Sequence, residues 1–246
     1  MASPWPQSPP TEAQRSAYAD AELRPFWSDT LEPRPPHAPL AEIRDADLCI
    51  VGGGYTGLWA ALYAKQTAPQ RDVVVLEATR CGAGASGRNG GFLQSSLTHG
   101  LGNGLARFPD ELERLEQLGM RNFEALVDDV QRLEIDAELE LTGDLGVALE
   151  DREVAELEDE ARTFRRHGYD AEVLDGPGVR ALVNSPMFRG GLWVRTGAAL
   201  VNPAKLADGL RAAAVRAGIA ICEYSPVRAL HRTRHGVEVR TEAGVV

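Results

Sequence analysis

The glycine-rich turn of this chain reads Ile50-Val51-Gly52-Gly53-Gly54-Tyr55-Thr56-Gly57. An apolar run at residues 48–51 leads into the turn, and a run of mostly small and apolar residues at 58–64 leads out of it. A second apolar run ends on Glu77, twenty residues after Gly57. The order of strand, glycine turn, helix, strand and acidic residue is the dinucleotide-binding fingerprint of an α/β fold.

Each position of the turn has a physical role in holding a pyrophosphate. Gly52 permits the tight turn, Gly54 has no Cβ and lets a pyrophosphate approach the backbone, and Gly57 lets the helix pack closely on the sheet. Tyr55 and Thr56 open the helix, whose free N–H groups and positive dipole end face the phosphates. We therefore predict that these five residues contact the cofactor.

The acidic residue Glu77 indicates which dinucleotides fit. Its carboxylate can accept hydrogen bonds from the hydroxyls of an adenosine ribose, and it would repel a 2′-phosphate, so the sequence disfavours NADP. The alternative is an ordinary glycine-rich loop without a ligand. The two strands, the helix and the acid in register argue against that alternative.

A second loop of small residues follows at once and reads Arg80-Cys81-Gly82-Ala83-Gly84-Ala85-Ser86-Gly87-Arg88-Asn89-Gly90-Gly91-Phe92. A simple nicotinamide-binding domain does not contain such a loop directly after the acid. The loop suits a long cofactor that lies against backbone, with Arg88 near phosphate charge and with Ser86 and Asn89 as hydrogen-bond donors.

These motifs resemble those of FAD-dependent oxidoreductases of the D-amino-acid oxidase superfamily, in the branch that resembles gamma-glutamylputrescine oxidase. The similarity extends from about Phe26 to the end of the chain. It is carried by three runs, which are Val51-Gly52-Gly53-Gly54-Tyr55-Thr56-Gly57, Gly84-Ala85-Ser86-Gly87-Arg88-Asn89-Gly90-Gly91 and Gly197-Ala198-Ala199-Leu200-Val201-Asn202-Pro203-Ala204-Lys205-Leu206. The resemblance implies FAD as cofactor and a Rossmann-like FAD-binding domain with an inserted, mainly β substrate domain.

The resemblance also implies roles for individual residues. Gly90 and Gly91 belong to the flavin-side loop, and Val227 meets the adenine through its backbone N–H and C=O. His99 lies in a stretch that passes near the isoalloxazine ring in the family, although a lone loop histidine is more often structural or solvated. No catalytic residue and no covalent flavin attachment is identified in this stretch of sequence.

The implied reaction is oxidation of a C–N bond in a small amine or amino acid. A hydride leaves the carbon beside a neutral amine for flavin N5, the imine hydrolyses in water, and oxygen is the expected acceptor. Two alternatives stay open. One is a nicotinamide dehydrogenase, which would need a continuing βαβαβ array after Glu77, and the other is a flavin-binding module without catalytic activity.

The domain organisation follows from changes of pattern along the chain. We expect a proline-rich arm at 1–44, the first part of the FAD-binding domain at 45–136, a partial substrate domain at 137–200, and a return to the FAD-binding domain, with the first strands of the next substrate-domain segment, at 201–246. The sequence predicts a short helix at 17–27, a long helix from Pro109 to about 130 and a third helix at 150–167. It also predicts a short helix that follows the turn at 176–178 and ends at 182, and a helix that Asn202 caps and Pro203 begins. It predicts strands at 138–141, 145–149, 171–174, 190–194 and 219–222.

Composition limits the class of protein. Hydrophobic content of 43%, charged content of 25% and a formal net charge of −10 over 246 residues are typical of a soluble globular chain and argue against nucleic acid or an anionic membrane as a partner. The three cysteines, Cys49, Cys81 and Cys222, are too scattered for a zinc site, so we predict no metal. No apolar run could span a bilayer and the amino terminus has no secretory pattern, so we expect a cytoplasmic protein.

The given sequence stops at Val246 in the middle of a pattern of predicted strands. Val246 ends a strand-like segment, whereas members of the resembled family continue well beyond this point with further strands and a final helix. We therefore expect a fold that is incomplete at the carboxyl end, with an exposed apolar sheet edge and poor folding of the isolated chain.

Overall fold

The computed structural model describes residues 9–22 and 24–246. Its central feature is a parallel sheet of three strands in the order β1-β2-β8, formed by Leu48–Val51, Val73–Leu76 and Ala220–Cys222. In register, Leu48 pairs with Val73 and Val74 pairs with Ala220. All four residues of β2 are buried, because the strand has a neighbour on each side and is covered on both faces.

Alternate residues of β2 belong to two different cores. Val73 and Val75 pack with residues of helices α2 (Tyr55–Thr67) and α7 (Pro203–Arg216) on one face of the sheet. Val74 and Leu76 pack on the other face with Leu40 and with Val239 of the hairpin β9–β10. That hairpin consists of Ala229–Arg232 and Val237–Arg240. Side chains alternate across a strand, so one apolar run supports both layers.

Strand β1 is paired on one side only within the described residues. Along its other side lies a cleft of about 650 Å³, lined by Leu48, Cys49 and Val51 of β1 and by residues of the β9–β10 hairpin. Val51 is 55% exposed. The other three residues of β1 are half-buried.

The helix that returns the chain to this sheet begins where the sequence predicts. Asn202 caps α7, its side chain accepting a hydrogen bond from the Lys205 amide at 3.2 Å, and Pro203 takes the first helical position. Gly218, with φ of +78°, follows the helix and turns the chain into β8.

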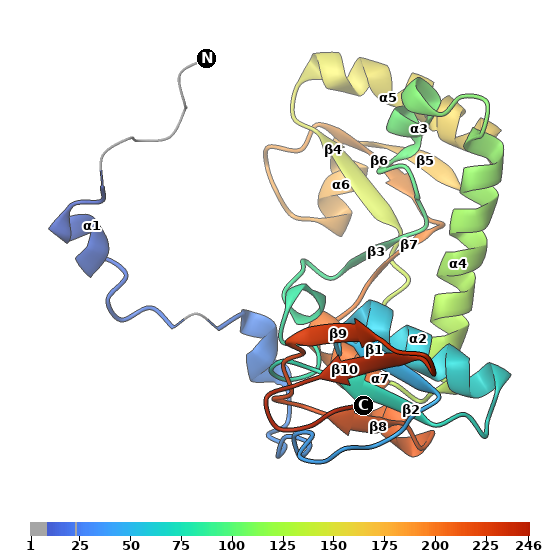
Figure 1. The fold of residues 1–246 in the computed structure, drawn as a ribbon. Coiled ribbons are helices and arrows are strands. Elements are labelled where there is room, and N and C mark those ends of the chain that lie inside the picture. The colour runs from blue at the N-terminus through green and yellow to red at the C-terminus, as the bar shows by residue number, and fades with distance from the viewer. Residues whose placement is uncertain (1–8, 23) are drawn as a thin grey trace.

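A second sheet forms a separate layer with its own core. It is antiparallel, in the order β4-β6-β5, and its strands are Asp144–Ala148, Gly190–Val194 and Ala171–Asp175. Helix α5 (Asp151–Arg166) packs on it through Leu157 and Ala161, and α6 (Gly176–Leu182) follows β5 directly. These elements lie at the opposite end of the molecule from the parallel sheet (Figure 1).

Two connections join the two sheets. Strands β3 (Phe92–Gln94) and β7 (Ala198–Leu200) pair antiparallel between them, and the long helix α4 (Leu112–Arg132) runs along one side from one end of the molecule to the other (Figure 1). The short helix α3 (Leu101–Arg107) precedes α4. Residues 138–141, predicted as a strand, make only an isolated bridge between Glu140 and Leu200.

The amino-terminal arm differs from its prediction. The expected helix at 17–27 is wrong. The described part of the arm holds a short helix α1 (Glu12–Ser16) and a 3-10 turn η1 (Phe26–Thr30). Thr11 and Gln14 form a capping box that fixes the start of α1. Pro25 is extended, with ψ of 148°, and a proline disfavours a helical residue before it, so no helix continues into η1.

Candidate functional site

The glycine turn connects β1 to α2 at the carboxyl end of the parallel strands. Gly52 has φ of +103°, a left-handed conformation that favours glycine, and its amide donates to the Leu76 carbonyl at 2.8 Å. A Cβ at Gly57 would lie 2.0 Å from the Gly52 carbonyl oxygen. The first turn of α2 therefore rests directly on the backbone that enters it.

The amino end of α2 presents backbone donors. The Tyr55 amide donates to Ser86 Oγ at 2.9 Å, and the Gly53 amide donates to Glu77 Oε2 at 2.7 Å. Among the residues that the structure describes, the amides of Gly54 and Thr56 have no acceptor. A Cβ at Gly52 would meet nothing within 4 Å, so space is open beside the turn. Free amides at a helix start beside open space fit a pyrophosphate.

Gly54 is needed for a protein contact as well. A Cβ at this position would lie 2.9 Å from Ser86 Oγ. Ser86 was predicted as a donor to the cofactor, and in the structure its Oγ accepts from the Tyr55 amide. A hydroxyl that accepts one bond keeps its own proton to donate, so the contact leaves this predicted role possible.

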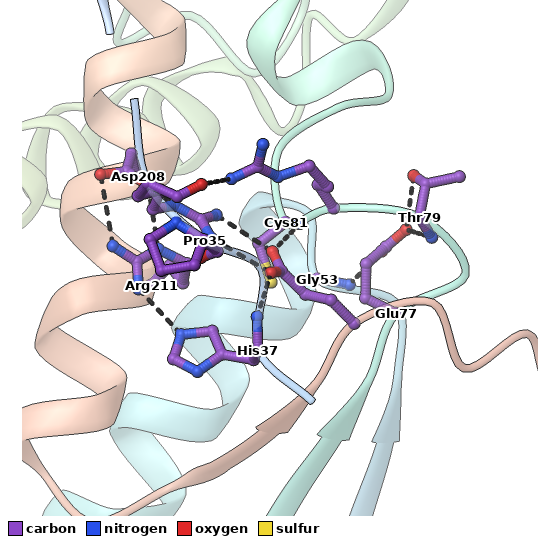
Figure 2. Close-up of polar contacts among 11 residues, drawn as sticks. Pro35, His37, Gly53, Glu77, Thr79, Cys81, Asp208 and Arg211 are labelled. Atoms are coloured by element: carbon purple, nitrogen blue, oxygen red, sulfur yellow. Dashed lines mark hydrogen bonds and ion pairs between the residues drawn. The ribbon is translucent and has the colours of Figure 1, made fainter. Parts of the chain in front are cut away.

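Glu77 follows the last residue of β2, and its carboxylate bonds both to the glycine turn and to Thr79. Oε2 accepts from the Gly53 amide, and Oε1 accepts from the amide of Thr79 at 2.8 Å and from its hydroxyl at 3.1 Å (Figure 2). The side chain is half-buried. These bonds hold the carboxylate next to the glycine turn, where its remaining lone pairs can accept ribose hydroxyls.

The side chain of Asn89, predicted as a donor to the cofactor, bonds to the backbone of its own loop. Its Nδ2 donates to the carbonyls of Ala85 and Ser86, and its Oδ1 accepts from the Gly91 amide at 3.0 Å. The physical reason is local, since an Asn side chain bonds readily to nearby backbone in a glycine-rich turn. Asn89 thus shapes the loop in this structure.

The two glycines after Asn89 shape the end of the loop. Gly91 has φ of +80°, and a Cβ there would lie 2.3 Å from the Val201 carbonyl oxygen. At Gly90 a Cβ would lie 3.2 Å from the ring of Phe92. Gly91 therefore brings the loop against the segment that leads into α7.

Arg88 lies exposed on the loop, and its Nε donates to the Ala83 carbonyl at 2.6 Å. No carboxylate of the described residues pairs with it, so its positive charge is free for an anion. It lines a cleft of about 450 Å³ between the loop and the amino-terminal arm.

Val227 follows β8 and is half-buried against the hairpin-side core. Its backbone N–H and C=O have no partner in the part of the chain that the structure describes. The segment before it is tied to the acidic residue of the site, because the Ser225 amide donates to the Glu77 carbonyl at 2.8 Å. The structure thus brings Val227 to the same edge of the sheet as Glu77.

A buried charge cluster at this edge was not found from the sequence. Glu223 is fully buried, and its carboxylate accepts from both terminal nitrogens of Arg34, at 3.0 and 3.1 Å, and from the amides of His37 and Cys81, each at 2.8 Å. Arg34 Nε also pairs with Asp208 at 2.7 Å. Figure 2 shows Arg211 between Asp208 and His37, with a hydrogen bond to each.

The cluster has a clear electrostatic effect. Burial alone would raise the pKa of Glu223, but the bonds from Arg34, Cys81 and His37 outweigh it and lower this pKa to about 2. The only signal in the sequence was an acid directly after an apolar strand, the position that Glu77 also takes after its own strand.

Cys81 and His99 lie in very different surroundings. Cys81 is buried, and burial raises the pKa of its thiol to about 12, so it packs and is not a nucleophile at neutral pH. His99 lies exposed in a turn with φ of +58°, and the described residues give its ring no hydrogen bond. The same residues contain no cluster able to ligate a metal ion, and none of their helices combines the length and apolar character needed to cross a bilayer.

Comparison with known proteins agrees with this site. The chain is 36% identical over 215 residues to gamma-glutamylputrescine oxidoreductase of Escherichia coli (strain K12). The matched region covers 86% of this chain and 49% of that protein. It superposes on glycine oxidase from Geobacillus kaustophilus with a TM-score of 0.65 at 23% identity, over 81% of this chain and 52% of the other. For glycine oxidase from Bacillus cereus ATCC 14579 the TM-score is 0.64 at 21% identity, over 82% and 53%.

The two structural likenesses confirm the fold class predicted from the sequence. The chain spans about half the length of the curated relatives it matches. A family model described as FAD dependent oxidoreductase, abbreviated DAO, matches residues 47–246, which include the glycine turn, the second loop and Val227. The cofactor of the family is FAD, in agreement with the sequence prediction. The chain therefore belongs to the DAO family of FAD dependent oxidoreductases.

Proposed function

We propose that this chain supplies the FAD-binding part of an oxidoreductase that acts on an amine or amino acid. The observation that carries the proposal is the amino end of α2, where the free amides of Gly54 and Thr56 adjoin open space over Gly52. Residues 45–136 and 201–246 would form the FAD-binding domain, the latter segment also starting further substrate-domain strands, and 137–200 part of the substrate domain. The nicotinamide alternative is not retained, because the family uses FAD.

Each protein group has a proposed task around the cofactor. The amides that begin α2 and the guanidinium of Arg88 would neutralise the pyrophosphate. The Glu77 carboxylate would accept the ribose hydroxyls, the Ser86 hydroxyl would donate to the cofactor, and the backbone of Val227 would meet the adenine. Asn89, Gly90 and Gly91 would hold the loop that flanks the flavin.

The reaction class comes from the relatives. One of them is named for gamma-glutamylputrescine and two for glycine, so we propose a substrate with an amino group on the carbon that is oxidised. Bound FAD would accept the hydride from that carbon, and oxygen is the proposed final acceptor. The protein's own task is to hold the C–H bond in reach and to exclude water from the amine.

The first test is FAD titration of the whole chain, followed by flavin absorbance and by chromatography of the cofactor released on heating. Glu77→Gln removes the charge but keeps the shape, and we expect FAD affinity to fall about tenfold, since a hydrogen bond to a charged group is stronger than a neutral one. Glu124→Gln is the matched control, because Glu124 is exposed on α4. Equal FAD affinity in the two variants would contradict the role of Glu77.

A second test separates an enzyme from a flavin-binding module without catalytic activity. The second candidate is kept because the chain spans about half the length of its relatives. Anaerobic mixing of the FAD-loaded chain with amines and amino acids should bleach the flavin absorbance if the proposed reaction occurs. Bound FAD that no amine reduces would favour the module.

A further inference from the structure

The amino-terminal arm contacts the proposed cofactor loop directly. The indole Nε1 of Trp27, in η1, donates to the backbone carbonyl of Asn89 at 2.9 Å, across 62 positions of sequence. The side chain of Asn89 simultaneously holds Ala85, Ser86 and Gly91. Trp27 thus binds the backbone of Asn89, the residue whose side chain holds the loop together.

The turn η1 is itself fixed to the rest of the molecule. Thr30 Oγ1 donates to the Trp27 carbonyl at 2.8 Å and accepts from Asn202 Nδ2 at 2.8 Å. Asn202 is 2% exposed and caps α7. A continuous series of hydrogen bonds therefore leads from the start of α7 through η1 to the loop.

The arm is anchored a second time, further along the chain. Arg34 binds the buried Glu223 and Asp208, and the Leu40 amide donates to Ser225 Oγ at 2.9 Å. Arg80, at the start of the loop, donates from Nη2 to the Arg34 carbonyl at 2.8 Å. The arm is thus anchored at Thr30 and again at Arg34 and Leu40, all on the carboxyl side of Trp27.

We propose that residues 26–40 are a clamp that orders the cofactor loop before FAD binds, with Trp27 as the positioning residue. The inference rests on the proposed function and reaches beyond it, because the family model begins at residue 47 and leaves this arm out. Five of the seven residues at 82–88 are glycine or alanine, and a glycine-rich chain loses much conformational freedom on ordering. A clamp that orders the loop beforehand reduces the conformational entropy that is lost when FAD binds.

The test uses the full chain with one substitution and one matched control. Trp27→Phe keeps an aromatic ring and deletes the indole N–H. Trp193→Phe makes the same change in β6, where Trp193 Nε1 donates to the Thr142 carbonyl at 2.9 Å, away from the loop. Hydrogen exchange is measured without FAD at the amides of Gly91 and Val201, which bond to Asn89 Oδ1 and to the Gly91 carbonyl.

We expect about fivefold faster exchange at these two amides in Trp27→Phe, the effect of one ordinary hydrogen bond, and about fivefold weaker FAD binding, with an unchanged thermal unfolding midpoint. Trp193→Phe should leave exchange at both amides and the FAD affinity as in the wild type. Exchange in Trp27→Phe equal to that of the control overturns the clamp. Faster exchange with unaltered FAD affinity overturns its role in binding.

The two proposals can fail separately. If the wild-type chain takes up no FAD, the proposed function of this chain fails, while the exchange experiment without FAD still decides whether the arm orders the loop. A loss of folding in Trp27→Phe, seen as a lower unfolding midpoint, would mean that Trp27 stabilises the whole domain, and would overturn a specific positioning role.

Discussion

At the scale of single residues, the buried carboxylate of Glu223 makes stability depend on pH. Its pKa is lowered from the ordinary 4.5 to about 2 in the fold. A lowered folded-state pKa gives stability that is present above about pH 4.5 and is lost as the pH falls toward about 2. The loss from this group is up to about 3 kcal/mol.

The variant Glu223→Gln isolates this contribution. We expect it to be less stable than the wild type at pH 7, because Arg34 loses a buried partner, by about 3 kcal/mol. We also expect the difference to shrink between about pH 4.5 and about pH 2, as the wild-type carboxylate becomes protonated. Urea unfolding at both ends of this range measures it, and a difference that stays constant with pH would show that the charge of Glu223 has no part in stability.

At the scale of elements, α2 packs so closely on the preceding glycine turn that Gly57 leaves no room for a larger side chain. The Cβ of Gly57→Ala would lie 2.0 Å from the Gly52 carbonyl oxygen, so helix or turn must shift. We expect a destabilisation of about 1 to 3 kcal/mol, together with weaker FAD binding. Gly102→Ala in α3 is the control, since its Cβ would meet nothing within 4 Å and alanine favours a helix. Equal stability of the two variants would contradict this packing.

How far the sequence predicts an element depends on whether its signals are local. Helix α7 was predicted closely because Asn202 and Pro203 define its start without help from tertiary structure. The helix expected at 17–27 was wrong because Pro25 lies within it, and a proline disfavours a helical residue before it. Glycines 52, 54 and 57 were placed at the turn from their spacing and from the flanking strands, helix and acid.

Contacts between distant segments could not be predicted in the same way. The bond from Trp27 to Asn89 and the ion pair from Arg34 to Glu223 join residues far apart in sequence, and neither residue type identifies its partner. Asn89 was assigned to the cofactor because an amide can bond outward or back to its own loop. Only the folded backbone shows that it bonds back.

At the scale of the whole molecule, a partly buried hydrogen bond joins α4 to the segment that leads into the second sheet. The Tyr169 hydroxyl, just before β5, donates to Glu116 Oε2 on α4, and Glu116 is 9% exposed with its other oxygen unpartnered among the described residues. Tyr169→Phe would leave this carboxylate without the bond. We expect a loss of about 2 to 3 kcal/mol in the free energy of unfolding, measured by urea denaturation.

The chain offers a matched control for this change. Tyr63 also donates its hydroxyl to a carboxylate of α4, Asp129, at 2.6 Å, but it is 45% exposed. Water can replace that bond, so Tyr63→Phe should cost less than about 1 kcal/mol. If both variants lose the same amount, burial is not what gives the Tyr169 bond its value.

In the part of the chain that the structure describes, β1 has a neighbouring strand on one side only. From β1 the chain builds its parallel strands in one direction only, to β2 and then to β8. Any further parallel strand beside β1 would reverse that direction, and the helices on either side of such a reversal diverge and leave a crevice at the carboxyl ends of the strands. Gly52 stands at that point. If such a strand lay beside β1, the Gly52 turn would lie at the mouth of the crevice and that strand would form its second wall.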